Sequence, residues 1–119
     1  MPTEAQHSDQ AQHNELMAEV VDLAPGVTGD WVITLKFYAA LYLLKQYLAR
    51  QGYEKNYKYD KLKDMLTRLH APQDVRFAFD DFLDLSAKYR YNCQWPQVLQ
   101  EDMDEADKFL ETIRQFAAA

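Results

Sequence analysis

The sequence contains few of the residues that build disulfides, metal centres and phosphate-binding loops. Its 119 residues include one cysteine (Cys93), three histidines, three glycines and four prolines. A single thiol excludes an internal disulfide and a zinc site of paired cysteines, so we expect a reducing, cytoplasmic location. The sequence has no Gly-rich phosphate loop and no His-Glu-x-x-His pair. We therefore expect neither a metal nor a cofactor.

Basic residues are also the minority. There are 13 Lys and Arg against 19 Asp and Glu, a formal net charge of −6. This excess favours solubility and argues against broad, nonspecific binding of nucleic acid. Residues 1–15 are polar and lack the apolar run of a signal peptide. We expect residues 1–10 to form a flexible tail and residues 11–119 to form one domain.

The longest stretch without glycine or proline, DWVITLKFYAALYLLKQYLAR, spans residues 30–50. Its few polar side chains are spread around a helical projection, so no wide polar face remains. Such a helix is typical of the central member of a bundle. Its two lysines, its threonine and its tyrosines fit a bilayer interior poorly, so we expect no membrane contact.

Helical spacing recurs on both sides of this stretch. We predict further helices over about 9–23, 60–70, 72–91 and 96–117, each with an apolar stripe. In the first, the stripe is Leu16, Met17, Val20, Val21 and Leu23, with Ser8 or Asn14 as candidate caps. All glycines and prolines lie in the breaks or near the N-terminus, and no stretch alternates with period two. The sequence therefore predicts an all-α, up-and-down bundle of four to five helices.

Candidate catalytic and metal-binding patterns are sparse. Glu4 and His7 have the Glu-x-x-His spacing of a di-iron bundle, but only one copy occurs. A nucleophile pair would have to join Cys93 to His70, which lie in different breaks. Asp80, Asp81 and Asp84 cluster on one helix and fit a solvated face better than a metal site. These patterns predict no catalytic residues.

A basic, tyrosine-rich segment offers a binding function. Residues 45–68 carry seven Lys and Arg against three Asp and Glu, interleaved with tyrosines. Cations with aromatics suit phosphate contact and base stacking, although a solvated link facing the acidic last helix explains the same pattern. The candidate nucleic-acid-binding residues are Lys55, Lys58, Lys61, Lys88, Arg90 and Tyr91.

Two segments are similar to a known family. Trp31 followed by FYAALY at 37–42, then Gly52 and the tyrosine-rich link, resembles the HEPN superfamily of small helical bundles. The segment FLDLSAKYRY at 82–91 resembles the end of a later helix in that family. The resemblance implies a helical bundle that commonly forms a two-fold dimer. It also implies links to RNA cleavage, toxin–antitoxin pairs and defence against phage.

The chain departs from this family at the positions that carry catalysis. HEPN ribonucleases have an Arg followed four to six residues later by His, whereas Arg90 is followed by Gln94, Trp95 and Pro96. Tyr42 also stands where relatives carry a histidine. Without an imidazole there, that hydrolysis lacks its acid–base group. The resemblance therefore implies a catalytically silent member.

Three functions follow as hypotheses. The first is a non-catalytic protein acting through homodimerisation and through binding of a protein or RNA, in a toxin–antitoxin or defence system. Its dimer and core residues would be Trp31, Leu35, Phe37, Tyr38, Leu41 and Tyr42. The alternative is a divergent ribonuclease or nucleic-acid-binding protein using Arg90 and the basic link. The third is a small-ligand pocket lined by Tyr38, Tyr42, Tyr89 and Trp95.

Overall fold

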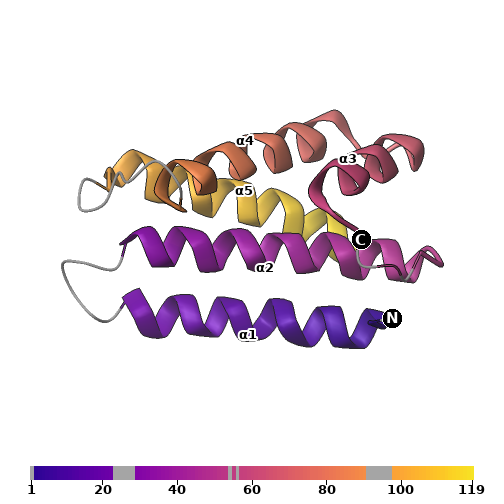
Figure 1. The fold of residues 1–119 in the computed structure, drawn as a ribbon, viewed down its shortest axis with the longest axis horizontal. Coiled ribbons are helices and arrows are strands. Elements are labelled where there is room, and N and C mark those ends of the chain that lie inside the picture. The colour runs from indigo at the N-terminus through magenta and orange to yellow at the C-terminus, as the bar shows by residue number, and fades with distance from the viewer. Residues whose placement is uncertain (1, 23–28, 54, 56, 91–97) are drawn as a thin grey trace.

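The computed structural model describes residues 2–22, 29–53, 55, 57–90 and 98–119, and these residues form an all-helical bundle. The helices are α1 (Glu4–Asp22), α2 (Gly29–Arg50), α3 (Tyr59–Arg68), α4 (Gln73–Arg90) and α5 (Gln100–Ala118). Figure 1 shows α1 and α2 side by side, with α4 and α5 on the other side of α2 and α3 near the start of α4. The predicted fold class is confirmed.

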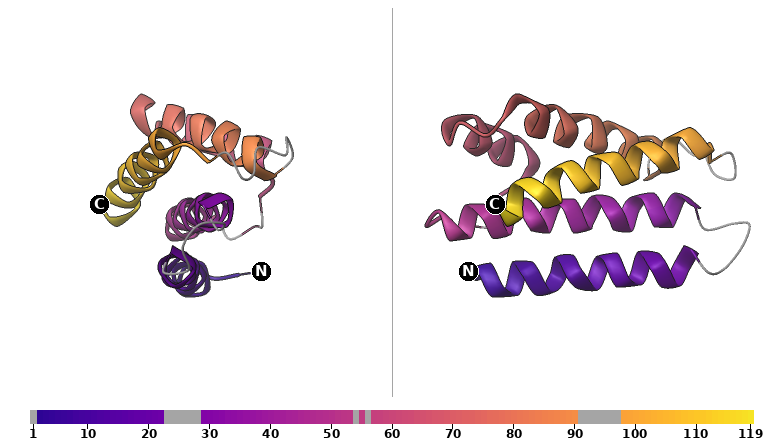
Figure 2. Two further views of the ribbon diagram at one scale, coloured as in Figure 1. Left: turned by 90° about the vertical axis from the view of Figure 1, so that its left-hand side faces the viewer. Right: turned by 180° about the vertical axis from the view of Figure 1, so that it is seen from behind.

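The helix predicted to be central is central. α2 packs against α1, α4 and α5, which surround it in the end-on view of Figure 2. Apolar side chains from Val32 to Ala49 are buried around most of its circumference. Since three elements cover α2, the sequence needs no wide polar face there.

Helix α1 begins earlier than predicted. The backbone N–H of Thr3 donates to Gln6 Oε1 at 2.9 Å, and the N–H of Gln6 donates to Thr3 Oγ1 at 3.2 Å. This reciprocal pair is a capping box, which satisfies two N–H groups at the start of a helix. The segment expected to be a flexible tail is therefore helical from Glu4 onward, and neither Ser8 nor Asn14 is its cap.

Three other predicted boundaries change by a few residues. Helix α3 begins at Tyr59, one residue before the predicted start at 60, and Lys58 precedes it. α4 begins at Gln73, and the carbonyl of Pro72 accepts its first backbone hydrogen bonds. α5 begins at Gln100, although we had predicted a start at Pro96. Pro96 itself lies outside the described residues.

The end of α2 follows the prediction. Gly52 has φ of 95°, a left-handed conformation that favours glycine. The N–H of Tyr53 donates to the carbonyl of Leu48 at 2.9 Å, which closes the helix end. This turn positions the segment that carries Tyr53, Lys55 and Tyr57.

Aromatic rings fill the core between α2, α4 and α5. Phe37 of α2 has its ring centroid 5.5 Å from that of Phe82 and 6.1 Å from that of Phe79, both on α4. Phe82 also contacts Phe109 of α5 at 5.6 Å. The predicted stripe of α4, from Val75 to Tyr89, is buried as expected.

Arg50 joins three helix ends. Its Nε lies 3.2 Å from Glu4 Oε1 at the start of α1, and its other nitrogens donate to the carbonyls of Ala117 and Ala119. Those carbonyls belong to the last turn of α5, which lacks intrahelical donors. Arg50 therefore closes one end of the bundle, where both chain termini lie in Figure 1.

Candidate binding surfaces

The candidate nucleic-acid-binding residues do not form one surface. Lys55, Lys58 and Lys61 line a groove beside α3, whereas Lys88 and Arg90 lie in the last turn of α4. No residue of that groove is shared with the smaller cavity that Arg90 lines. The structure thus separates residues that the sequence had grouped, and Tyr91 lies outside the described residues.

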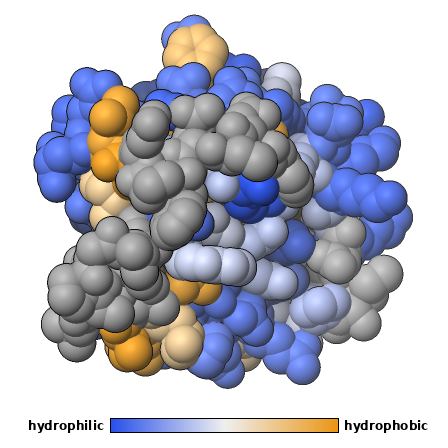
Figure 3. Space-filling view, turned by 60° about the vertical axis from the view of Figure 1, so that its left-hand side comes forward, coloured by the Kyte–Doolittle hydropathy of each residue, from blue (hydrophilic) through white to orange (hydrophobic). Residues whose placement is uncertain are grey.

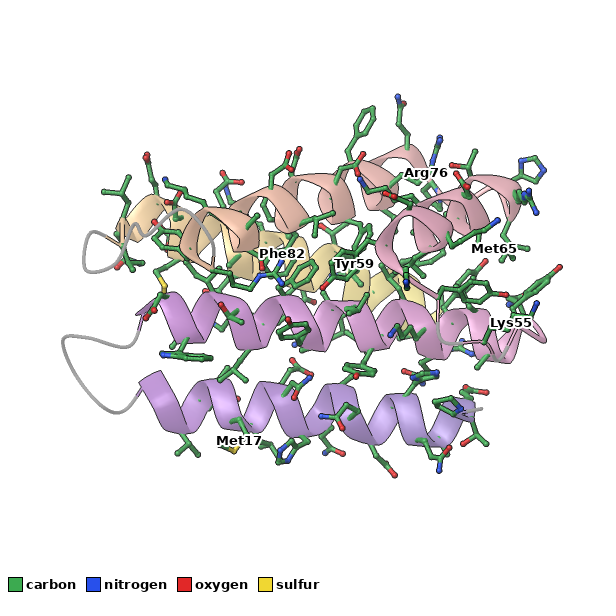
Figure 4. The ribbon with its side chains drawn as sticks, in the orientation of Figure 1. Met17, Lys55, Tyr59, Met65, Arg76 and Phe82 are labelled. Carbon is green, nitrogen blue, oxygen red and sulfur yellow. The ribbon has the colours of Figure 1, made fainter. Side chains whose placement is uncertain are left out.

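The groove beside α3, called the basic groove below, has a volume of about 840 Å³. Its lining comes from the turn after α2, the following link, α3 and the residue after α3. It comprises Gly52, Tyr53, Lys55, Tyr57, Lys58, Lys61, Asp64, Met65, Arg68 and Leu69. Figure 4 shows Lys55 and Met65 at the same end of the molecule. Four cations against one carboxylate give the groove a positive character.

Three lysines outside the groove are paired with carboxylates. Lys36 lies 2.6 Å from Asp107, Lys63 lies 2.5 Å from Asp80, and Lys88 lies 2.8 Å from Asp102. In the part of the chain that the structure describes, no ion pair joins a groove cation to a carboxylate. Among the described ion pairs, none joins a cation of residues 45–68 to a carboxylate of the acidic last helix, since Arg50 pairs with Glu4 and Lys63 with Asp80.

Arg90 is held against aromatic rings. Its guanidinium carbon lies 5.2 Å from the Phe37 ring centroid and 5.6 Å from that of Tyr38, and Nη1 donates to the Tyr38 hydroxyl at 3.2 Å. Burial raises the pKa of the neighbouring Tyr59 phenol, while a hydrogen bond from Arg90 opposes that rise. Through these contacts Arg90 links the end of α4 to α2 and to the start of α3.

Beside Arg90 is a cavity of about 320 Å³. Its lining comprises Asp30, Trp31, Thr34, Tyr38, Tyr89 and Arg90. Two residues of the small-ligand hypothesis, Tyr38 and Tyr89, are therefore brought together. Tyr42 is not part of this cavity, because its ring packs 5.8 Å from that of His7 on α1. Trp95 lies outside the described residues.

Asp102 ties α5 to α4. It accepts hydrogen bonds from Lys88 Nζ and from the Tyr89 hydroxyl, which itself accepts one from the Leu99 N–H at 3.3 Å. Burial alone would raise the pKa of Asp102, but these two hydrogen bonds and the charge of Lys88 hold it below its ordinary value. The carboxylate has only 13% of its surface exposed and serves the junction between these helices.

Three of the five residues in the apolar stripe predicted on α1 face outward, and the side chains of the other two, Val21 and Leu23, lie outside the described residues. Leu16, Met17 and Val20 are 53%, 38% and 60% exposed, respectively. Figure 4 shows Met17 on the side of α1 away from α2, and Figure 3 shows hydrophobic residues at the lower edge of one face, where α1 lies. An apolar stripe on a bundle helix is expected to face the core, and these three residues do not. We call the three residues the α1 outer face.

The inner side of α1 carries small and polar residues instead. His7, Ala11, Asn14 and Ala18, spaced four, three and four residues apart, are buried against α2. Small residues let the two helices approach closely, which leaves no room for larger side chains. The buried face could have been found from the helical spacing of its small and polar residues. It was missed because we looked for large apolar residues at that spacing.

Glu4 and His7, which share the Glu-x-x-His spacing, make structural contacts. His7 is buried against Tyr42, and Glu4 lies at Arg50 and is part of no metal site. Over the described ranges, no cluster of three or more His, Cys, Asp or Glu is placed to hold a metal ion. Cys93 lies outside those ranges, so the proposed pairing with His70 is not described.

The residues of the proposed dimer and core set divide by burial. Phe37 and Leu41 are fully covered within one chain, so they belong to the core. Leu35, Tyr38 and Tyr42 are half-buried, and Trp31 is exposed. A surface centred on α2 is therefore mostly occupied by α1, α4 and α5.

Comparison with known proteins identifies no relative: no family model, no curated protein and no solved structure matches this chain. None of the helices that the structure describes is long and apolar enough to cross a bilayer.

Proposed function

We propose that this chain is a non-catalytic helical protein that acts through association, first with a second copy of itself through the α1 outer face. The observation that carries the proposal is the inverted pattern of α1, with alanines inside and Leu16, Met17 and Val20 outside. Monomers rarely expose contiguous large apolar side chains, and such patches mark interaction sites.

A second copy fits this surface because one apolar patch can cover itself under two-fold symmetry. Two α1 helices crossing between Leu16 and Met17 would bury both patches in a closed contact. Covering a half-exposed Leu, Met or Val contributes about 0.7–1.5 kcal/mol, so six of them supply about 4–9 kcal/mol. This gain is of the same order as the cost of association, so we expect micromolar dissociation.

The resemblance to HEPN bundles, which commonly form two-fold dimers, supports the same proposal. It also supports a role in a toxin–antitoxin or defence system, in which the dimer would present surfaces to a second macromolecule. The lack of an Arg-to-His spacing of four to six residues supports a role without catalysis.

Sedimentation at tens of micromolar tests the dimer. The double variant Leu16→Glu, Val20→Glu should be monomeric, because two carboxylates per chain would be buried in the contact. The matched control is Ala5→Glu, Gln6→Glu, which adds the same charge to exposed positions at the other end of α1. The control should remain dimeric, and circular dichroism should show unchanged helix content in both. A strictly monomeric wild type would overturn the proposal.

The alternative, a ribonuclease or nucleic-acid-binding protein, has weaker support. Lys88 is paired with Asp102, and Arg90 lies against Phe37 and Tyr38, so these two cations have structural roles. If the alternative holds, Arg90→Ala should weaken RNA binding or cleavage at low salt under conditions in which circular dichroism shows the variant to be folded. If the variant instead lowers the thermal midpoint alone, Arg90 is a structural residue.

A further inference from the structure

The basic groove lies apart from the α1 outer face, and its lining includes no residue of α1. We infer that this groove binds a short acidic segment of another protein, with one apolar anchor side chain seated on Met65 and Leu69. The inference does not depend on the dimer, and the two can fail separately.

Charge is the first support. Lys55, Lys58, Lys61 and Arg68 face the groove, and among its described lining residues only Asp64 carries a negative charge. The chain carries a net charge of −6 and pairs Lys36, Lys63 and Lys88 with carboxylates, so an unpaired basic cluster runs against its general pattern. A cluster of this kind attracts an acidic ligand and speeds its association.

The apolar part of the groove is the second support. Met65 is almost fully buried and Leu69 is half-buried, while Tyr53 is 40% exposed at the rim. Methionine adapts its shape to different apolar side chains and is common in peptide-binding surfaces. A leucine or phenylalanine from the partner can therefore be seated there while flanking carboxylates reach the lysines.

These features favour a peptide over RNA. Three of the four cations are lysines, which lack the forked geometry with which arginine grips phosphate. The lining includes Tyr53 and Tyr57, whose rings suit base stacking, but Met65 and Leu69 add an aliphatic surface that an apolar side chain fits better than a base does. A long polyanion would also extend beyond the groove over a protein of net negative charge, whereas a short acidic segment would not.

Fluorescence anisotropy with a labelled twelve-residue peptide, rich in Asp and Glu around one central Leu, tests the inference. We expect micromolar binding that weakens with added salt and falls when the central Leu is replaced by Ser. Lys61→Glu should weaken binding roughly tenfold, as expected for reversal of a charge facing the ligand. The matched control is Lys108→Glu, the same change at an exposed position of α5, and it should leave binding nearly unchanged.

Competing ligands decide between the partner classes. A twelve-nucleotide poly-U RNA and vesicles containing phosphatidylglycerol should bind more weakly than the peptide at the same salt concentration. Stronger binding of either one, failure of the peptide to bind, or equal effects of Lys61→Glu and Lys108→Glu would overturn the inference. The monomeric variant Leu16→Glu, Val20→Glu should still bind the peptide, which separates this result from that of the dimer.

Discussion

The two sides of α2 pack by different means. Toward α4 and α5, large rings such as Phe37, Phe79 and Phe82 interlock in a core with no exposed surface. Toward α1, the buried side chains are alanines and polar groups such as His7 and Asn14. The first side gains stability from the apolar area it buries, whereas the second depends on close backbone approach.

This difference in packing determines which large apolar residues remain exposed for association. Helix α1 docks with small residues and therefore keeps Leu16, Met17 and Val20 outside. The predictions below test this contrast, from the largest expected effect to the smallest.

Removing a ring from the aromatic side should have the largest effect. Phe82 is fully buried between Phe37 and Phe109, so Phe82→Ala should lower the free energy of unfolding by about 3–5 kcal/mol. Phe77→Ala is the matched control, because Phe77 lies on the same helix and is 55% exposed. Its effect should stay below about 0.5 kcal/mol. Chemical denaturation measures both, and similar losses would contradict this description of the core.

Enlarging a small residue should disrupt the α1 side. Ala18 is buried against α2, so Ala18→Leu should cost about 1–3 kcal/mol through overpacking. Ala5→Leu makes the same change at an exposed position of α1 and should be nearly neutral. Hydrogen exchange should show the loss of protection concentrated in α1. If Ala18→Leu matched its control, close packing would not be what holds α1.

The smallest effect concerns Lys45, which is buried near Tyr42 with its Nζ 5.0 Å from the ring centroid. Burial lowers the pKa of Lys45 below its ordinary 10.5. Between the lowered value and 10.5 the unfolded chain binds more protons, so stability should rise with pH in that window. Below the window the cost of burying the charge is fully present.

Unfolding free energies of the wild type and of Lys45→Met, measured from neutral to alkaline pH, test this sign. The wild type should gain stability relative to the variant as the pH rises. The control Lys61→Met removes an exposed lysine, so the difference in unfolding free energy between the wild type and this control should not change with pH. A difference between wild type and Lys45→Met that is independent of pH would show that the lysine titrates alike in both states.

Particular residues show what could be read in advance. The end of α2 at Gly52 and the buried stripe of α4 were predictable, because glycine at a helix end and large apolar residues at helical spacing have direct local causes. The start of α1 is also encoded locally, by the capping box of Thr3 and Gln6. Because residues 1–10 are polar, we interpreted them as a flexible tail. For the basic groove, the sequence analysis selected Lys55, Lys58 and Lys61, which do line it. It also grouped them with Lys88 and Arg90, which lie elsewhere.

By itself the sequence determined the helical class, the central place of α2 and the few breaks, because these depend on local periodicity and on glycine and proline. Tertiary structure decided which face of α1 is buried and which cations share a groove. Helical periodicity identifies a stripe, but a stripe of alanines and a stripe of larger residues can each be the buried one. The choice depends on how closely the neighbouring helix approaches, which is a property of the assembled bundle.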